Sequence, residues 1–156
     1  MSVLDGFDFK IMSALQEDGG STNAALADRV GLSASQCSRR RAALEAAGYI
    51  RGYRADLDPE KLGFTIEAFT RVTLAAHSET TADEFAAFLG RCPEVQQAHA
   101  ISGDADYLVH IRGRSLTDLA DFIHGRLLPH KQVSQVRSDI VLRTIKENRG
   151  FAVGLR

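Results

Sequence analysis

Residues 23–53 read NAALADRVGLSASQCSRRRAALEAAGYIRGY, and this stretch decides how the N-terminal part of the chain folds. Its first part is an apolar helical pattern that ends at Val30 and Gly31, and a glycine there favours the left-handed conformation that terminates a helix. Ser33 can then cap a second helix, because Gln36 stands three residues on and each side chain can satisfy the other residue's free backbone N–H. The stretch therefore predicts two helices joined by a very tight turn.

The second helix of this pair is expected to have an inner and an outer side. Cys37, Arg41 and Leu44 recur at helical spacing and predict the inner side. The outer residues are Ser35, Gln36, Ser38, Arg39 and Arg40. A polar helix held at a helix–turn–helix corner suits the DNA major groove, because guanidinium groups read guanine edges and Gln or Ser can hydrogen-bond to bases.

Positive charge is concentrated in the same region. Residues 39–54 contain five arginines and one glutamate, a net charge of +4, whereas the formal charge of the whole chain is −1. A surface that neutralises phosphates needs such clustering and does not need a basic protein. The alternative stays open here, since helix–turn–helix corners also occur in proteins that do not bind DNA, and a run of arginines is often a solvated face.

Composition indicates a folded protein of one or two small domains: 156 residues, of which 44% are hydrophobic and 25% charged. No apolar run approaches the roughly 20 residues that a membrane helix needs, and the first residues show no secretion signal, so we expect a cytoplasmic protein without a membrane partner. Cys37 and Cys92 are far apart and indicate reduced, packed thiols. The histidines (His77, His99, His110, His124 and His130) show no metal-ligand spacing, and we expect no metal or other cofactor.

A further helix is expected before the pair, from about residue 5 to residue 17. Asp5 can cap it, and Asp8 lies in its first turn, where negative charge is favoured. The three helices would form a DNA-binding unit with a small shared core. The predicted core residues are Ile11, Leu15, Leu26, Val30, Leu44 and Ile50.

Residues 49–57 read YIRGYRADL and predict a short strand or hairpin, the wing of a winged helix–turn–helix domain over residues 1–57. Arg51 and Arg54 are then expected near the DNA backbone, although a plain connecting strand is the alternative. Residues 58–63 are predicted to be a linker. The expected DNA-binding residues are Ser33, Ser35, Gln36, Ser38, Arg39, Arg40, Arg51 and Arg54.

The rest of the chain, residues 64–156, alternates between strand and helix patterns. Strands are predicted at 64–75, 95–102, 106–113 and 133–145, and helices at about 81–91 and 116–127. The order βαββαβ folds most simply as a four-stranded antiparallel sheet with both helices on one face, the ferredoxin-like arrangement. The predicted fold class is α+β, with a winged helix–turn–helix domain followed by a ferredoxin-like domain for ligand sensing and dimerisation.

The second face of this sheet is predicted to be partly apolar. The residues assigned to it are Phe69, Ala98, Ala100, Val133 and Val141. A domain of about 90 residues does not readily leave such a face in water, so we expect it to pack against a second copy of the chain. A two-fold dimer would present two recognition helices to half-sites about 34 Å apart. The tail at 150–155 (GFAVGL) is expected to add a last strand.

The chain also carries a series of motifs in a recognisable order. They are Leu4-Asp5-x-x-Asp8-x-x-Ile11, Leu26-Ala27-x-Arg29-Val30-Gly31-Leu32-Ser33, Cys37, Arg40, Leu44-Glu45, Gly48-Tyr49-Ile50-x-Gly52-Tyr53 and Gly103-Asp104-x-Asp106-Tyr107. In order and spacing, over nearly the whole chain, these motifs resemble those of the Lrp/AsnC, or feast/famine, transcriptional regulators.

The resemblance implies a winged helix–turn–helix that binds double-stranded DNA as a homodimer, assembling further to a tetramer or octamer. It also implies a C-terminal domain that senses an amino acid where dimers meet. In that family the turn between the two middle strands lines the effector pocket. The corresponding positions are Gly103, Asp104, Ala105, Asp106 and Tyr107, and either aspartate could pair with the ammonium group of the effector.

The recognition helix departs from the family pattern. Ala34 and Gln36 stand near its start, where many members have proline, and Arg41 stands where they have an aliphatic residue. An arginine on the inner side has to run along Leu44 or pair with a carboxylate, because an unpaired buried charge is costly. Base preferences of relatives therefore do not transfer to this chain.

The function predicted is that of a sequence-specific DNA-binding transcriptional regulator, not an enzyme, that responds to a small molecule. The alternative is a ferredoxin-like amino-acid sensor module without DNA binding. The residues at 103–106 favour a turn in any protein, so without the resemblance a plain hairpin is the preferred interpretation of this segment. Catalysis would need Asp104, Asp106, His99 and His110 to act together, and no phosphate loop, nucleophile elbow or metal motif accompanies them.

Overall fold

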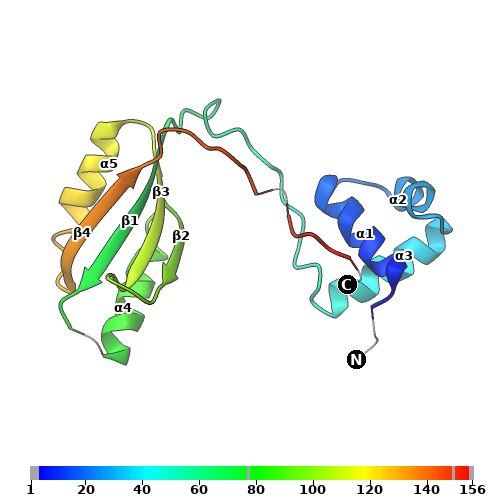
Figure 1. The fold of residues 1–156 in the computed structure, drawn as a ribbon, viewed down its shortest axis with the longest axis horizontal. Coiled ribbons are helices and arrows are strands. Elements are labelled where there is room, and N and C mark those ends of the chain that lie inside the picture. The colour runs from blue at the N-terminus through cyan, green and yellow to red at the C-terminus, as the bar shows by residue number, and fades with distance from the viewer. Residues whose placement is uncertain (1–3, 77, 149, 155–156) are drawn as a thin grey trace. The chain divides into compact units, whose positions relative to one another are not determined.

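A computed structural model describes residues 4–76, 78–148 and 150–154. The contacts divide the chain into two compact units, one of residues 1–56 with 146–156 and one of residues 57–145 (Figure 1). The predicted second domain, 64–156, differs from this division at its end, because the described residues from Lys146 onward group with the first unit. No helix in the described part of the chain is both long and apolar enough to cross a membrane.

The first unit contains the three predicted helices, α1 (Gly6–Glu17), α2 (Asn23–Val30) and α3 (Ala34–Ala46). Asp5, Thr22 and Ser33 cap them, as the local sequences favour. Their buried side chains form one cluster. It consists of Ile11, Ala14, Leu15, Leu26, Ala27, Val30, Cys37 and Leu44, with Ile50 packed against it, so the predicted core is confirmed.

Two glycines end the helices of the corner. Gly31 has φ +76°, in the left-handed region, and only Leu32 and the capping residue Ser33 separate it from α3. Gly48 has φ +77°, and its N–H donates to the Glu45 carbonyl at 3.0 Å. Gly31 therefore ends its helix as predicted, and Gly48 does the same after α3, because a side chain is strained at these φ values.

The strand or hairpin predicted at 49–57 is wrong: all of these residues are described, and none of them forms a strand. An isolated two-stranded hairpin has too little packing to be stable in water. The segment is instead tied to α3 by a side chain, because the Tyr53 hydroxyl accepts a hydrogen bond from Arg41 and donates one to Glu45.

The tail contacts α1 of its own unit. The backbone N–H of Phe151 donates to Gln16 Oε1 at 2.6 Å, and Gln16 Nε2 donates to the Phe151 carbonyl at 2.9 Å. The strand predicted at 150–155 does not form in residues 150–154, and Leu155 lies outside the described residues. The Gln16 amide thus satisfies both backbone groups of Phe151, and the Gly150 N–H donates to Asn148 Oδ1, in place of a neighbouring strand.

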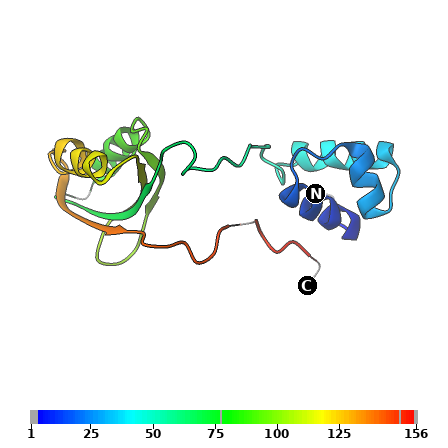
Figure 2. The same cartoon turned by 90° about the horizontal axis from the view of Figure 1, so that it is seen from above.

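The second unit has the predicted order βαββαβ. Its elements are β1 (Ile66–Leu74), α4 (Glu79–Leu89), β2 (Val95–Ala100), β3 (Tyr107–Gly113), α5 (Leu116–Phe122) continued by the π-helical turn η1 (Ile123–Leu127), and β4 (Val133–Ile140). The sheet is antiparallel with strand order β2-β3-β1-β4, and both helices cover one face of it (Figure 2). The ferredoxin-like prediction is confirmed.

The two faces of the sheet follow the alternation of β1. Ala68, Thr70 and Val72 are buried beneath the helices, whereas Phe69 and Arg71 point to the open face. The assignment of three residues to the open face was wrong. Ala98 and Ala100 pair with Val109 and Tyr107, on the helix side, and Val133 packs against the core.

Strand β4 stops at Ile140, although the prediction extended it to residue 145. Its last pair is Ile140 with Ala68, and among the described residues only the Val141 N–H continues the contact, to the Glu67 carbonyl at 2.9 Å near the start of β1. Beyond this point Leu142 is 96% exposed. An apolar pattern alone does not make a strand when there is no backbone to pair with.

Candidate DNA interface and ligand turn

The first turn of α3 is fixed by the predicted reciprocal cap. Ser33 Oγ accepts a hydrogen bond from the Gln36 N–H at 3.2 Å, and Gln36 Oε1 accepts one from the Ser33 N–H at 2.9 Å. The amide nitrogen of Gln36 keeps both of its N–H donors for another acceptor. Two of the predicted DNA-binding residues are thus partly used to start the helix.

The outer side of α3 is exposed and carries mostly short side chains. Only Cys37 and Leu44 of its residues are buried. The exposed side includes Ser35, Ser38, Arg39, Ala42, Ala43 and Ala46. Arg39 forms no ion pair or hydrogen bond with any other described residue, so its guanidinium is available to a ligand. Short neighbours let the helix backbone come close to the floor of a groove.

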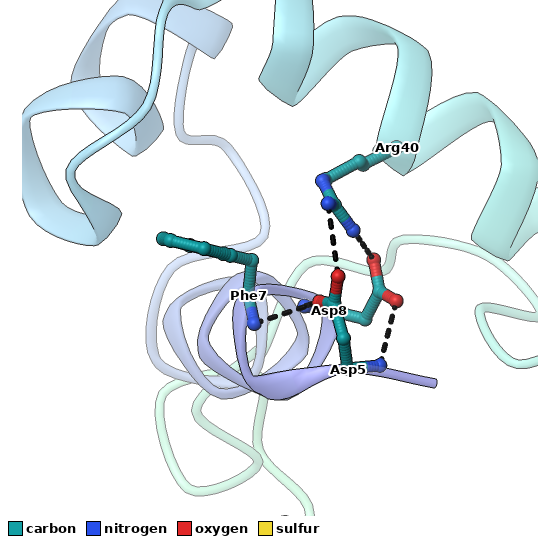
Figure 3. A network of polar contacts seen from close by, with 4 residues as sticks. All are labelled: Asp5, Phe7, Asp8 and Arg40. Atoms are coloured by element: carbon teal, nitrogen blue, oxygen red, sulfur yellow. Dashed lines mark hydrogen bonds and ion pairs between the residues drawn. The ribbon is translucent and has the colours of Figure 1, made fainter. Parts of the chain in front are cut away.

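Arg40 lies on the flank of α3 and points to the N-terminus of α1 (Figure 3). Its guanidinium is 2.8 Å from Asp8 Oδ1 and 2.9 Å from Asp5 Oδ2. The hydrogen bond to Asp8 is the main cause that raises the pKa of Arg40. The backbone N–H of Asp8, with Arg40 as a further partner, holds the pKa of Asp5 below its ordinary value. The predicted DNA-binding residue Arg40 therefore already has two carboxylate partners.

Arg41 lies on the opposite flank of the inner side. It pairs with Glu45 at 3.2 Å, stacks over the Tyr53 ring with its guanidinium carbon 4.4 Å from the ring centroid, and donates to the Ser21 carbonyl. Of the two expected arrangements, running along Leu44 or pairing with a carboxylate, the structure shows the pairing. The hydroxyl of Tyr53, followed by Arg41, lowers the pKa of Glu45 and keeps that partner charged.

Arg51 and Arg54 follow α3 in the segment without regular structure. Both are exposed, and neither pairs with an acidic group in the described ranges. Unlike Arg40 and Arg41, they have free guanidinium groups. Exposed, unpaired arginines that follow the helix of a helix–turn–helix corner are suited to phosphates rather than to base edges.

The predicted effector turn joins β2 to β3 and is anchored by one of its two aspartates. Asp106 Oδ2 accepts a hydrogen bond from the Leu74 N–H at 2.7 Å, and the Asp106 N–H donates to the Val72 carbonyl at 3.0 Å. Asp104 is exposed, whereas Ala105 is buried. Asp106 thus holds the turn to β1, and Asp104 is the carboxylate presented to solvent.

The other two positions of the turn have different surroundings. Gly103 has φ +141°, with nothing within 4 Å of an added Cβ, so the backbone conformation and not crowding favours glycine there. Tyr107 begins β3, and its ring lies 5.1 Å from the Phe85 ring in the core. Burial raises the pKa of the Tyr107 hydroxyl.

A small depression on the open face of the sheet lies beside this turn. It is lined by Arg71, Thr73, Asp104, Ala105, Gln135 and Arg137. Arg71 and Arg137 stand directly opposite each other on β1 and β4, and Arg71 is paired with Asp139. Sequence reasoning missed both arginines, because alternation gives the face of each strand but not which strands are neighbours.

The rest of the open face has a polar network and one stacked pair. Glu67 is 2.6 Å from His110 Nε2 and 3.0 Å from Arg112, and the His110 ring stacks on Phe69 at 4.8 Å. The partner of His110 is thus a glutamate, and neither Asp104 nor Asp106. Among the described residues no three His, Cys, Asp or Glu side chains are placed to hold a metal ion, and His77 lies outside that set.

The fold and these surfaces define a class: a helix–turn–helix DNA-binding unit joined to a ferredoxin-like unit, the architecture of ligand-responsive transcriptional regulators. Residues 4–51 match the family model described as winged helix-turn-helix DNA-binding, and residues 67–151 match that of the Lrp/AsnC ligand binding domain. The chain belongs to the Lrp/AsnC family of transcriptional regulators. The predicted family and fold class are confirmed.

Individual relatives agree along the length of the chain. It is 40% identical to the leucine-responsive regulatory protein of Rhizobium meliloti and 36% identical to the proline dehydrogenase transcriptional activator of Rhizobium radiobacter, over 92% of each chain in both cases. A transcriptional regulator of Neisseria meningitidis, solved in complex with L-Met, is 38% identical, with a TM-score of 0.90 over 93% of this chain and 94% of that one. The structure of E. coli AsnC is similar in fold, with a TM-score of 0.85 and 24% identity.

Proposed function

We propose that this regulator binds double-stranded DNA by laying the outer side of α3 in the major groove. Ser35, Ser38 and Arg39 then face the base edges, while Arg51 and Arg54 meet phosphates. The observation that carries this proposal is the exposed side of α3, where Arg39 has no partner among the described residues. Ser33 and Gln36 support the contact by fixing the first turn of the helix.

The test is the affinity of the full chain for a duplex that it selects from a random-sequence pool, measured by fluorescence anisotropy. Arg39→Ala should weaken binding about 5- to 150-fold, the worth of one good base contact. Arg91→Ala removes an exposed arginine from the second unit and serves as the matched control. If Arg39→Ala binds as tightly as the control, α3 does not contact the bases. If the chain selects no duplex, the alternative function, an amino-acid sensor without DNA binding, is the better account.

We propose further that an α-amino acid binds in the depression beside the β2–β3 turn. Asp104 would pair with its ammonium group, because Asp106 is bound to the backbone of β1. Arg137 would take its carboxylate: it lines the same depression and has no ion-pair partner in the described part of the chain. Charged groups of both signs in one small site fit a zwitterion.

A thermal-shift screen of the amino acids tests this site. A ligand at about 100 times its dissociation constant should stabilise the folded chain by about 2.7 kcal/mol. Asp104→Asn and Arg137→Gln should each abolish the shift, whereas Arg143→Gln, at an exposed arginine outside the depression, should keep it. A shift that both site variants retain would place the ligand elsewhere.

The open sheet face is proposed to form the homodimer, with further assembly to tetramers or octamers. Phe69 is 38% exposed at its centre, and the charges of Glu67, Arg71 and Arg112 on the same face are already paired within the chain, which lowers the cost of burying them. Phe69→Glu should shift the mass measured by light scattering toward one chain, and Leu116→Glu on the helical layer should not. Dimers that persist in Phe69→Glu would rule out this face.

The ligand and the dimer contact would share one face of the sheet. A bound amino acid can therefore change how two chains pair, and with it the spacing of the two α3 helices on DNA. Under this proposal the chain acts by binding and not by catalysis, and it works in the cytoplasm, where its DNA lies.

A further inference from the structure

Arg40 belongs to a closed network with the N-terminal cap of α1 (Figure 3). Asp5 Oδ1 accepts the N–H groups of Phe7 and Asp8 at 2.9 and 3.0 Å, and Asp8 Oδ2 accepts the N–H of Asp5 at 3.0 Å. The remaining oxygen of each carboxylate binds Arg40. All four carboxylate oxygens are therefore occupied, and the cap of α1 and the anchor of α3 are one structure.

This network sets a direction for α3 that core packing alone defines poorly. Only two side chains of the 13-residue helix are buried. With so narrow an apolar face, core packing fixes the rotation of the helix through few side chains, and the two flanking arginines add the further contacts. Arg40 on one flank and Arg41 on the other bind different parts of the unit, the start of α1 and the segment around Tyr53. Arg39, next to Arg40 in the chain, takes its direction from them.

The same geometry makes Arg40 a poor phosphate ligand. One positive charge faces two carboxylates, so Arg40, Asp5 and Asp8 together carry a net charge of −1. A phosphate that approached it would be repelled by both aspartates. The Asp8 side chain is only 14% exposed and Arg40 27%, so breaking the pair would leave a half-buried charge without its partner.

We propose that Arg40 is a positioning residue: through Asp5 and Asp8 it fixes the rotation of α3 so that Ser35 and Arg39 face the bases, and it makes no phosphate contact of its own. This inference rests on the proposed DNA binding by α3. The two neighbouring arginines then have different roles: Arg39 contacts the bases, and Arg40 fixes the orientation of α3.

The experiment compares Arg40→Gln, Arg39→Gln and Asp8→Asn with the wild-type chain, on the selected duplex and on an unrelated duplex, over a series of salt concentrations. If Arg40 is a positioning residue, Arg40→Gln should lower the affinity for the selected duplex about 5- to 150-fold, because base contacts are misplaced. The affinity for the unrelated duplex should fall far less. The salt slope of Arg40→Gln should equal that of the wild type. Asp8→Asn, which keeps an oxygen for the cap, should weaken the selected duplex too.

If Arg40 instead bound a phosphate, Asp8→Asn should have the opposite effect on DNA affinity. Removing this negative charge would free Arg40, and Asp8→Asn would then bind both duplexes more tightly. Arg40→Gln would flatten the salt slope by about 0.9 per bound chain. Either result overturns the inference while Arg39→Gln still reports DNA binding, whereas a wild-type chain that selects no duplex overturns the proposed function and the inference together.

Two further variants guard against misfolding. Asp5→Ser keeps a good helix cap and removes only one of the two ion pairs, so it should lower affinity for the selected duplex with an unchanged thermal midpoint. The double variant of Asp8→Asn and Arg40→Gln should cost no more affinity than the worse single variant, because both break the same pair. Additive losses of affinity would show that Arg40 acts independently of Asp8 and would overturn the positioning role.

Discussion

Replacing Arg51 and Arg54 together by alanine should flatten the salt dependence of DNA binding while leaving the fold intact. Both side chains are exposed and lie in the segment after α3 that has no regular structure. Neither has an ion-pair partner among the described residues, in contrast to Arg40 and Arg41. Each is therefore free to meet one phosphate per bound chain, and its loss removes one counterion-releasing contact.

The magnitude follows from the number of contacts. Each phosphate contact contributes about 0.9 to the slope of log affinity against log salt, so the double variant should lose about 1.8 per bound chain and about 3.6 for a dimer. Between about 50 and 200 mM salt, the wild-type dimer should lose roughly 150 times more affinity than the variant dimer. The difference should be about 12-fold if one chain binds.

Anisotropy titrations at several salt concentrations measure both slopes on the same labelled duplex. The matched control replaces Arg91 and Arg143, two exposed arginines outside the first unit's helices, and so has the same change in net charge. Parallel slopes for the wild-type chain and the Arg51/Arg54 variant would refute the phosphate contacts. Equal flattening by the control would assign the effect to the charge of the whole chain.

Three other predictions concern the second unit. Phe85→Ala should destabilise it by about 3–5 kcal/mol in chemical denaturation, because Phe85 is fully buried, whereas Leu142→Ala at an exposed position should change little. Burial lowers the pKa of His130 from its ordinary 6.5, so the unfolded chain takes up a proton that the folded chain does not. Stability should therefore fall as pH drops through that ordinary value and level off below the lowered pKa, and His130→Asn should remove this slope. The isosteric change Thr70→Val should cost about 0.5–1.5 kcal/mol, because the buried Thr70 hydroxyl bonds Ser138 at 2.9 Å. Thr70→Ser keeps the hydroxyl, so it should retain this hydrogen-bond contribution and lose only the packing of the methyl group.

Local chemistry carried the successful predictions from sequence. Asp5, Ser33 and Gln36 define helix starts, and Gly31 and Gly48 define ends, within a few residues of chain. The alternation along β1 likewise gave its two faces correctly. Each of these features depends on residues close in sequence, which is why no knowledge of the tertiary structure was needed.

The wrong predictions all depend on residues far apart in the chain. Ala98 was predicted on the open face, but its pairing with Val109 places it on the helix side of the sheet. The sequence of one strand does not determine its register with the next. The strand predicted at 49–57 failed for a related reason. A strand needs a neighbouring strand to satisfy its backbone; here the N–H groups of Tyr49 and Ile50 donate to the Leu44 carbonyl at the end of α3, and Arg41 and Glu45 bind only the side-chain hydroxyl of Tyr53.

The arginines of α3 follow the same logic and bear directly on function. Helical spacing already placed Arg41 on the inner side, but Arg39 and Arg40 were two equivalent cations in the sequence. Only the contact of Arg40 with Asp8, 32 residues away, sets those two apart. The unit uses two of the three to hold the helix and presents the third. The proposed DNA-binding surface therefore consists of polar side chains that the small domain does not use for helix caps, ion pairs or backbone hydrogen bonds. The residues to mutate first are therefore those without an internal partner.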